Sequence, residues 1–207
     1  MNPAELRERI RRCLHSTHQI ETITGDHVEA GIAAEERTLT PAAVLVPLVE
    51  RLEGYTVLLT QRTAHLEHHP GQISFPGGRA EEGDASPVET ALREAEEEIG
   101  LLRRHVVEIA GFLDLYQTVT GFLVTPVVGL VTPPFELRLD EFEVAEAFEV
   151  PLEFILDPRH HEHRSMVYKG QQRRYYVIPY EERLIWGATA AMLVALARRL
   201  TGDPLLP

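Results

Sequence analysis

The feature that most constrains this sequence is a glycine-rich loop that leads directly into a capped, strongly acidic helix within residues 75–100. Ser86 has the side chain of an N-cap, and Pro87 suits the first helical position. Glu89 completes a capping-box pattern three residues after Ser86, and Gly100 suits the position after the last turn. The spacing therefore predicts a helix over 86–99. Its apolar side chains form one stripe that can pack on a sheet, namely Val88, Ala91, Leu92, Ala95 and Ile99.

Three glutamates occupy the helix face beside that stripe. At about 100° per residue, Glu94, Glu97 and Glu98 fall within one sector. Like charges at this spacing repel each other, so Glu97→Gln is expected to stabilise the metal-free protein. Bound Mg²⁺ or Mn²⁺ would offset the repulsion, because these cations prefer oxygen ligands. A solvated acidic face and a metal site both remain open, and the adjoining Pro-Gly-Gly loop and Arg93 favour the metal site.

The rest of the chain indicates strands with a few helices. Residues 3–15 and 185–200 have the apolar spacing of amphipathic helices, the second one including Trp186 as a packing residue. Strands are predicted at 41–50, 55–60, 106–113, 122–131 and 146–152, with hairpins over 41–60 and 166–180. Pro126 predicts a kink, a bulge or an edge position for its strand. Residues 61–78, 133–142 and 159–164 are predicted to be loops, and 16–40 have no assignment. This pattern indicates an α/β or α+β sandwich.

Composition narrows the class of partner. The chain has 207 residues, which suits one domain, and its net charge of −12 disfavours nucleic acid and anionic membranes as partners. No stretch approaches the roughly 20 apolar residues of a membrane span. Residues 1–18 carry charges where a signal peptide needs an apolar region, and Cys13 is the only cysteine, so we expect a cytoplasmic protein without an intrachain disulfide.

A resemblance to the Nudix hydrolase family lies in residues 75–101, FPGGRAEEGDASPVETALREAEEEIGL. The general Nudix box is G-x5-E-x7-R-E-U-x-E-E-x-G-U, where U is a bulky apolar residue. The matching positions are Gly78, Arg93-Glu94, Glu97-Glu98 and Gly100-Leu101. This sequence departs from the pattern in three ways. Asp84 replaces the first glutamate, one extra residue separates it from Arg93, and Ala95 stands at a bulky position.

The flanking segments are similar to the coenzyme A pyrophosphatase subgroup of that family. Residues 58–78, LLTQRTAHLEHHPGQISFPGG, resemble its upstream motif, and 120–129, 143–152 and 179–193 resemble downstream ones. The resemblance implies a single Nudix domain over 1–207, with a core at about 40–195 and an N-terminal helical extension. The implied fold is an α/β/α sandwich with a mixed β-sheet. Glu67 and Ala191 depart from it, because relatives usually carry arginine at those positions.

The resemblance also implies a site for Mg²⁺ or Mn²⁺. Its ligands are three carboxylates and one backbone carbonyl, those of Glu94, Glu97, Glu98 and Gly77. Gly78, Asp84 and Arg93 shape the box, with Arg93 pairing with a box carboxylate such as Asp84.

Further residues are expected to act on the substrate. Glu98 or Glu143 would take the proton of the attacking water, with a solvated loop residue as the alternative for Glu143. Arg62 would contact a phosphate, or else form a surface salt bridge. Thr120 and Phe122 would line the substrate pocket, or else belong to the core.

The residues alone predict a divalent-metal phosphoanhydride hydrolase acting on a small molecule. The resemblance implies cleavage of coenzyme A or acyl-CoA to adenosine 3′,5′-bisphosphate and (acyl-)4′-phosphopantetheine, and it leaves a homodimer open. Two alternatives stand beside it. One is hydrolysis of another nucleoside diphosphate derivative, such as ADP-ribose, a dinucleotide or a nucleoside triphosphate, which Glu67 favours. The other is a Nudix-like binding module without turnover.

Overall fold

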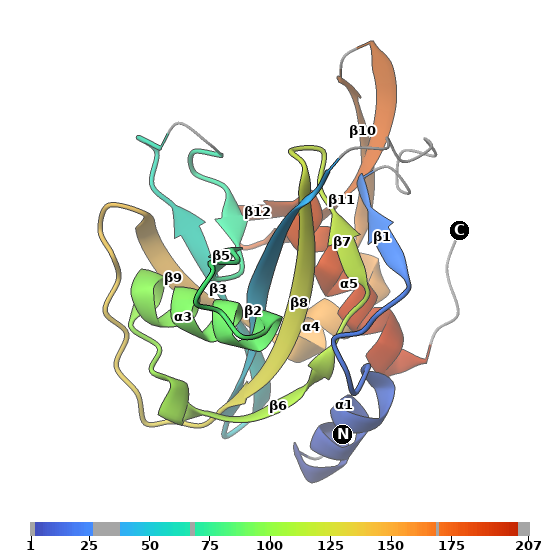
Figure 1. Ribbon diagram of the computed structural model, residues 1–207. Coiled ribbons are helices and arrows are strands. Elements are labelled where there is room, and N and C mark those ends of the chain that lie inside the picture. The colour runs from blue at the N-terminus through green and yellow to red at the C-terminus, as the bar shows by residue number, and fades with distance from the viewer. Residues whose placement is uncertain (1–2, 27–37, 67–68, 169, 203–207) are drawn as a thin grey trace.

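The computed structural model describes residues 3–26, 38–66, 69–168 and 170–202 (Figure 1). Glu67, which the sequence analysis singled out, lies outside the described residues. Among the described residues, no helix is both long and apolar enough to cross a membrane.

A mixed sheet of nine strands forms the centre of the molecule. Strand β2 (Thr40–Arg51) lies between β8 (Phe122–Val131), which is parallel to it, and β3 (Gly54–Arg62), which is antiparallel. Beyond β3 lie β4 (Ile73–Ser74) and β9 (Val144–Pro151), and β5 (Gly77–Arg79) also pairs with β2. On the far side of β8 lie β6 (Val106–Phe112) and β7 (Leu115–Gln117), with β1 (Ile23–Gly25) outermost. The predicted hairpin over 41–60 is therefore confirmed.

Helices cover both faces of this sheet, as the alternation along β2 requires. Leu45 and Val49 face a core cluster shared with α3 (Pro87–Ile99), whereas Val46 and Leu48 face a larger cluster on the other side. The larger cluster is covered by α1 (Pro3–Cys13), α4 (Leu152–Leu156) and α5 (Ala188–Thr201). Figure 1 shows α3 alone in front of the sheet and α4 and α5 behind it. The expected α/β/α sandwich with a mixed β-sheet is confirmed.

A smaller antiparallel sheet differs in part from the sequence expectation. It contains β10 (Glu162–Tyr168), β11 (Gln171–Tyr180) and β12 (Arg183–Trp186), and β10 and β11 form the predicted hairpin. Residues 159–164 were expected to be a loop, but β10 begins at Glu162. The final helix was expected from 185, but Trp186 ends β12 and is 40% exposed. Gly187 separates the strand from the helix. Its φ of 66° explains why this position is a glycine, because other residues rarely adopt that conformation.

Of the three settings expected for Pro126, the structure excludes the edge position. Strand β8 is central rather than at an edge, with β2 on one side and β6 and β7 on the other. Pro126 lies between the stretch paired with β7, which ends at Val124, and the stretch paired with β6, which begins at Val127. The Pro126 carbonyl accepts a bond from the Leu113 N–H at 3.2 Å. The backbone nitrogen and carbonyl of one strand residue point to the same side, so the Pro126 nitrogen, which has no hydrogen to donate, also faces this junction. Pro126 therefore costs the ladder little.

The glycine-rich segment 61–78 is more regular than a loop. It contributes β4 and β5, each too short to show a sequence period. The described residues also include two single turns of 3₁₀ helix, at Arg103–His105 (η1) and Pro158–His160 (η2). The β5 strand pairs with β2 and contacts α3, which places the glycines beside the acidic helix.

Candidate functional site

Helix α3 has the predicted caps. The Ser86 Oγ accepts a hydrogen bond from the Glu89 N–H at 3.4 Å. At the other end, Gly100 has φ 67°, and its N–H donates to the Glu96 carbonyl at 3.0 Å. Ala91 and Ala95 are fully buried against the sheet. The small apolar stripe therefore brings the helix close to the sheet and fixes which glutamates face the glycine-rich strand β5.

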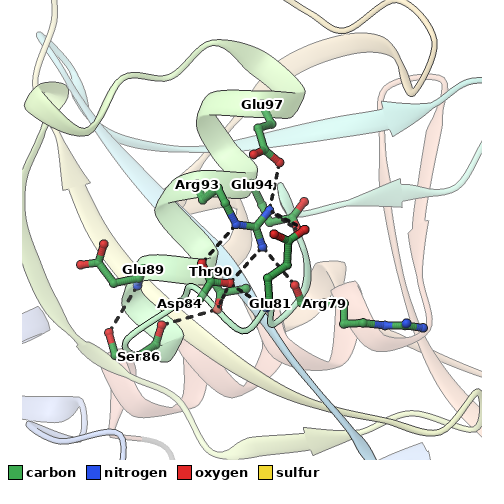
Figure 2. A network of polar contacts seen from close by, with 9 residues as sticks. All are labelled: Arg79, Glu81, Asp84, Ser86, Glu89, Thr90, Arg93, Glu94 and Glu97. Carbon is green, nitrogen blue, oxygen red and sulfur yellow. Dashed lines mark hydrogen bonds and ion pairs between the residues drawn. The ribbon is translucent and has the colours of Figure 1, made fainter.

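Arg93 lies at the centre of a polar network that joins the helix to the loop before it (Figure 2). Its Nε and Nη2 donate to the two Asp84 carboxylate oxygens at 3.1 and 3.0 Å. Its Nη1 donates to Glu94 at 3.0 Å and to Glu97 at 2.9 Å, and Nη2 also reaches the Arg79 carbonyl at 3.1 Å. The expected pairing of Arg93 with Asp84 is present in the structure. Bidentate geometry makes it a strong and directional contact.

Asp84 accepts more than the arginine bonds. The Glu81 N–H and the Thr90 hydroxyl both donate to its Oδ2 at 2.9 Å. The Arg93 bonds, followed by those of Glu81 and Thr90, hold the pKa of Asp84 well below its usual range. An aspartate at the position of the general box's first glutamate thus contacts Arg93 through both of its carboxylate oxygens.

Glu98 is the buried carboxylate of the site. It is only 8% exposed, and its Oε2 accepts a bond from the Gly77 N–H at 3.2 Å. Burial raises the pKa of Glu98 to about 8, and the Gly77 bond opposes this rise. The charges of Glu94 and Glu143 raise this pKa further, whereas that of Arg62 lowers it. Burying an ionised carboxylate is costly without a cation beside it.

Glu94 lies directly over the glycine loop. Burial raises the pKa of Glu94, while the charge and hydrogen bond of Arg93 oppose this effect. A Cβ added at Gly78 would stand 2.5 Å from a Glu94 carboxylate oxygen. The glycine at this position therefore leaves the space that the Glu94 carboxylate occupies.

The donor set suits a hard divalent cation, although the carboxylates do not converge in the structure. Glu97 is 58% exposed at its side chain and turns toward Arg93, as Glu94 does. Within the described residues, no three His, Cys, Asp or Glu side chains form a ready-made metal-binding group. The chemistry nevertheless fits Mg²⁺ or Mn²⁺, because the buried Glu98, Glu94 and the Gly77 backbone offer only oxygen ligands.

Arg62 and Glu143 extend the site beyond the helix. Arg62 ends β3, and its Nη1 lies 3.8 Å from the Glu143 Oε2. Both residues act on the Glu98 carboxylate through their charges. Two residues far apart in sequence thus lie near the buried Glu98 carboxylate, and the contact that Arg62 makes here is the salt bridge named as its alternative.

Thr120 and Phe122 lie at a different edge of the site. Thr120 is exposed in the turn before β8, and its hydroxyl is 2.9 Å from that of Thr118. Phe122 is partly buried against the larger core, and the Arg79 guanidinium lies 6.0 Å from its ring centroid. Phe122 therefore approaches the box through Arg79, whereas the Thr120 hydroxyl bonds within its own turn.

Some contributors escaped the sequence reading. Thr90 completes the shell of Asp84, and Thr63 bonds the loop that carries Glu143 through its N–H and its hydroxyl. Thr63 lies in the LLTQRT segment, and its position next to Arg62 was the only feature of the sequence that could have pointed to it as a site residue. Two other residues lie away from the site. Ala191 is buried in α5 on the opposite face of the sheet, and the Cys13 carbonyl accepts a bond from Arg199.

Comparison with known proteins identifies the sequence pattern. The family model described as the NUDIX domain matches residues 39–170. A protein of Enterobacter sp. (strain 638), named Nudix hydrolase NudL, is 42% identical over 163 residues, covering 79% of this chain and 84% of that protein. The Escherichia coli (strain K12) protein of the same name is 40% identical over 163 residues with the same coverage.

Solved structures support the fold alone, because their sequence identity is low. RenU, a Nudix hydrolase from M. smegmatis, has a TM-score of 0.51 at 20% identity, covering 84% of this chain and 94% of that one. A MutT/nudix family protein from Enterococcus faecalis has a TM-score of 0.50 at 16% identity, covering 98% of this chain and 75% of that one.

Proposed function

Because this chain belongs to the Nudix hydrolases, a family of enzymes that act on pyrophosphate bonds, we propose that it cleaves the pyrophosphate of coenzyme A or acyl-CoA. The products are adenosine 3′,5′-bisphosphate and (acyl-)4′-phosphopantetheine. The substrate is a small molecule, and Mg²⁺ or Mn²⁺ is the cofactor.

The observation that carries this proposal is the set of residues around the Glu98 carboxylate. The Nudix box supplies Glu98 and Gly77, and the two flanking segments supply Arg62 and Glu143. Those flanking segments, 58–78 and 143–152, resemble the coenzyme A pyrophosphatase subgroup. The residues that suggest the substrate and the residues that suggest the metal thus lie in one place.

Four groups are proposed to hold the metal, the carboxylates of Glu94, Glu97 and Glu98 and the Gly77 carbonyl. A bound divalent cation supplies positive charge to the pyrophosphate oxygens and lowers the pKa of a water. Arg93 restrains Glu94 and Glu97 until they turn toward the cation, and it keeps its bidentate bond to Asp84 throughout.

The protein's own groups are proposed to place the substrate and move one proton. Arg62 binds a phosphate, and Phe122 and Thr120 line the far side of the pocket. Glu143 takes a proton from the attacking water, with Glu98 as the alternative acceptor. The water oxygen forms the new P–O bond, and the bond from that phosphorus to the bridging oxygen breaks. The leaving phosphate carries away the electron pair.

Another nucleoside diphosphate derivative is the second candidate substrate. Glu67 supports it, because an acidic residue where relatives carry arginine would weaken a contact with an extra phosphate. A binding module without turnover is the weaker alternative, because the chain retains the Arg93-Glu94 and Glu97-Glu98 pairs of the box. A cytosolic location and a homodimer remain predictions.

A substrate panel tests the proposal. The purified protein is incubated with Mg²⁺ or Mn²⁺ and, separately, coenzyme A, acetyl-CoA, ADP-ribose, a dinucleotide and nucleoside triphosphates, and the products are identified by mass spectrometry. We expect adenosine 3′,5′-bisphosphate from coenzyme A, loss of turnover in Glu98→Gln, and retained turnover in Glu96→Gln. Turnover of ADP-ribose with inert coenzyme A would refute the subgroup assignment, and tight binding without any turnover would support a binding module.

A further inference from the structure

Thr63 joins two loops at the edge of the candidate site. It follows Arg62 at the end of β3 and is only 7% exposed. Its N–H donates to the Glu143 carbonyl at 2.9 Å, and its hydroxyl donates to the Phe142 carbonyl at 2.8 Å. Its own carbonyl accepts a bond from the Gly71 N–H at 3.4 Å. The backbone and side chain of one threonine thus tie the glycine-rich loop to the acidic loop.

The acidic loop, residues 137–143, is also attached to the end of α3, where the Arg138 N–H donates to the Ile99 carbonyl at 2.9 Å. The Asp140 N–H donates to the Glu98 carbonyl at 2.8 Å, which fixes the start of the loop on α3. The Asp140 carbonyl and side chain then accept bonds from Glu143 and Phe142 N–H groups at 3.0 Å. The two bonds from Thr63 hold the other end.

Burial secures the chain just after this end of the loop, at Val144, which is 4% exposed and begins β9. Phe142 and Glu143 are not secured in this way. Phe142 is 65% exposed, and its ring meets the His65 ring edge-on at 4.9 Å. The Glu143 side chain is 43% exposed. Because little apolar surface of Phe142 and Glu143 is buried, the hydrogen bonds to Thr63, together with the buried Val144, set the backbone position from which the Glu143 side chain extends.

We propose that Thr63 is a positioning residue, which holds the Glu143 carboxylate beside Glu98 and Arg62 through its bonds to the Phe142 and Glu143 carbonyls. The inference rests on the proposed function, in which Glu143 takes the proton of the attacking water. The Thr63 hydroxyl donates to the Phe142 carbonyl. Its effect on the reaction passes through the loop alone, and a misplaced base slows the proton transfer more than it weakens substrate binding.

Two substitutions separate the hydroxyl from the rest of the side chain. Thr63→Val keeps the shape and removes the donor, whereas Thr63→Ser keeps the donor. Thr189→Val is the matched control, because the buried Thr189 hydroxyl also donates to a carbonyl, that of Ile73 at 3.0 Å, in a bond that does not involve the acidic loop. With coenzyme A and Mn²⁺, we expect Thr63→Val to lower kcat about tenfold with KM within about twofold. Thr63→Ser and Thr189→Val should keep kcat within about twofold of the original protein.

Hydrogen exchange of the metal-free protein gives a readout without turnover. Thr63→Val should speed amide exchange in residues 140–144 and leave residues 87–99 unchanged, whereas Thr189→Val should leave both unchanged. Unchanged exchange in 140–144 would overturn the proposal. So would an equal loss of kcat when Thr63→Val is added to Glu143→Gln, because the loss should vanish once the base is absent.

The two proposals fail in different ways. If the protein hydrolyses none of the panel substrates, the proposed function is refuted, and the exchange experiment still decides whether Thr63 holds the loop. If coenzyme A is hydrolysed and Thr63→Val keeps the original kcat, the positioning role is refuted and the proposed function stands.

Discussion

Glu98→Gln is expected to make the metal-free protein more stable at alkaline pH. The glutamate is 8% exposed, and burial raises its pKa to about 8, against 4.5 for the group in an unfolded chain. An acid with a raised pKa stabilises the fold at low pH, and this contribution is lost as pH rises through the folded pKa. Stability therefore falls between about pH 4.5 and pH 8. The two pKa values set an upper limit of about 5 kcal/mol on the loss, at about 1.36 kcal/mol per pH unit.

Glutamine keeps an oxygen that can accept the Gly77 N–H bond and does not titrate. The original protein and the variant should therefore have similar free energies of unfolding near pH 5, and the variant should be several kcal/mol more stable near pH 9. Urea unfolding in EDTA, followed by circular dichroism, measures both. Adding Mn²⁺ at pH 9 should stabilise the original protein and have little effect on the variant, because only the original presents the carboxylate.

Glu96→Gln is the control, since it removes the same charge from the same helix at an exposed position. It should follow the pH dependence of the original protein. Parallel pH dependences for the original protein and Glu98→Gln would refute the reasoning, because the cost would then not come from the buried Glu98 carboxylate.

Three further substitutions test the rest of the site. The sequence alone leads to the expectation that Glu97→Gln stabilises the metal-free protein. In the structure this half-exposed side chain already pairs with Arg93, so the substitution should change the free energy of unfolding by less than about 0.5 kcal/mol. A gain above about 1 kcal/mol in urea unfolding would contradict this prediction. Asp84→Asn should lower the free energy of unfolding by about 1.5–3 kcal/mol near neutral pH. It should also flatten the loss of stability below pH 4, because the lowered pKa of Asp84 stabilises the fold above pH 3.8 and this contribution disappears as pH falls. If the free energy of unfolding falls equally steeply with acid in both proteins, this role of Asp84 is excluded. Gly78→Ala should weaken Mn²⁺ activation about tenfold with little change in Tm, because the new methyl displaces the end of the Glu94 side chain. Gly83→Ala is the control, because the space around Gly83 is open. Equal Mn²⁺ activation constants for the two variants would count against the role of Gly78.

The local chemistry of the site could be predicted because it lies within one short segment. Ser86, Pro87 and Gly100 fix where α3 begins and ends through bonds to neighbouring residues, so their meaning does not depend on the rest of the fold. The same holds for the Arg93 bond to Asp84, which joins two positions nine residues apart. The apolar runs at 41–50 and 55–60 likewise predicted the hairpin, because a strand that is covered on both faces needs apolar residues on both.

Short strands and their pairing partners could not be predicted from local sequence patterns. β4 and β5 are two and three residues long, too short for a period, and they exist because longer strands beside them offer hydrogen-bonding edges. The helix expected for Trp186 was wrong because its strand, β12, is also too short to show a sequence period. The apolar neighbours of Trp186 suit a helix, and only the pairing with Val177 in β11 assigns this residue to a strand.

The sequence by itself determined the family, the capped acidic helix and the chemical nature of the site, because these depend on residue types at fixed spacings. The tertiary structure decided which carboxylate is buried. Glu94, Glu97 and Glu98 look equivalent on a helical wheel, but the sheet and β5 enclose Glu98, Gly78 lies under Glu94, and Glu97 remains half-exposed. It also brought Thr63 to the acidic loop from 80 positions earlier in the sequence, through a strand pair that no local pattern specifies. Burial and long-range hydrogen bonds are properties of the packed chain, and they set the pKa values and positions on which the chemistry depends.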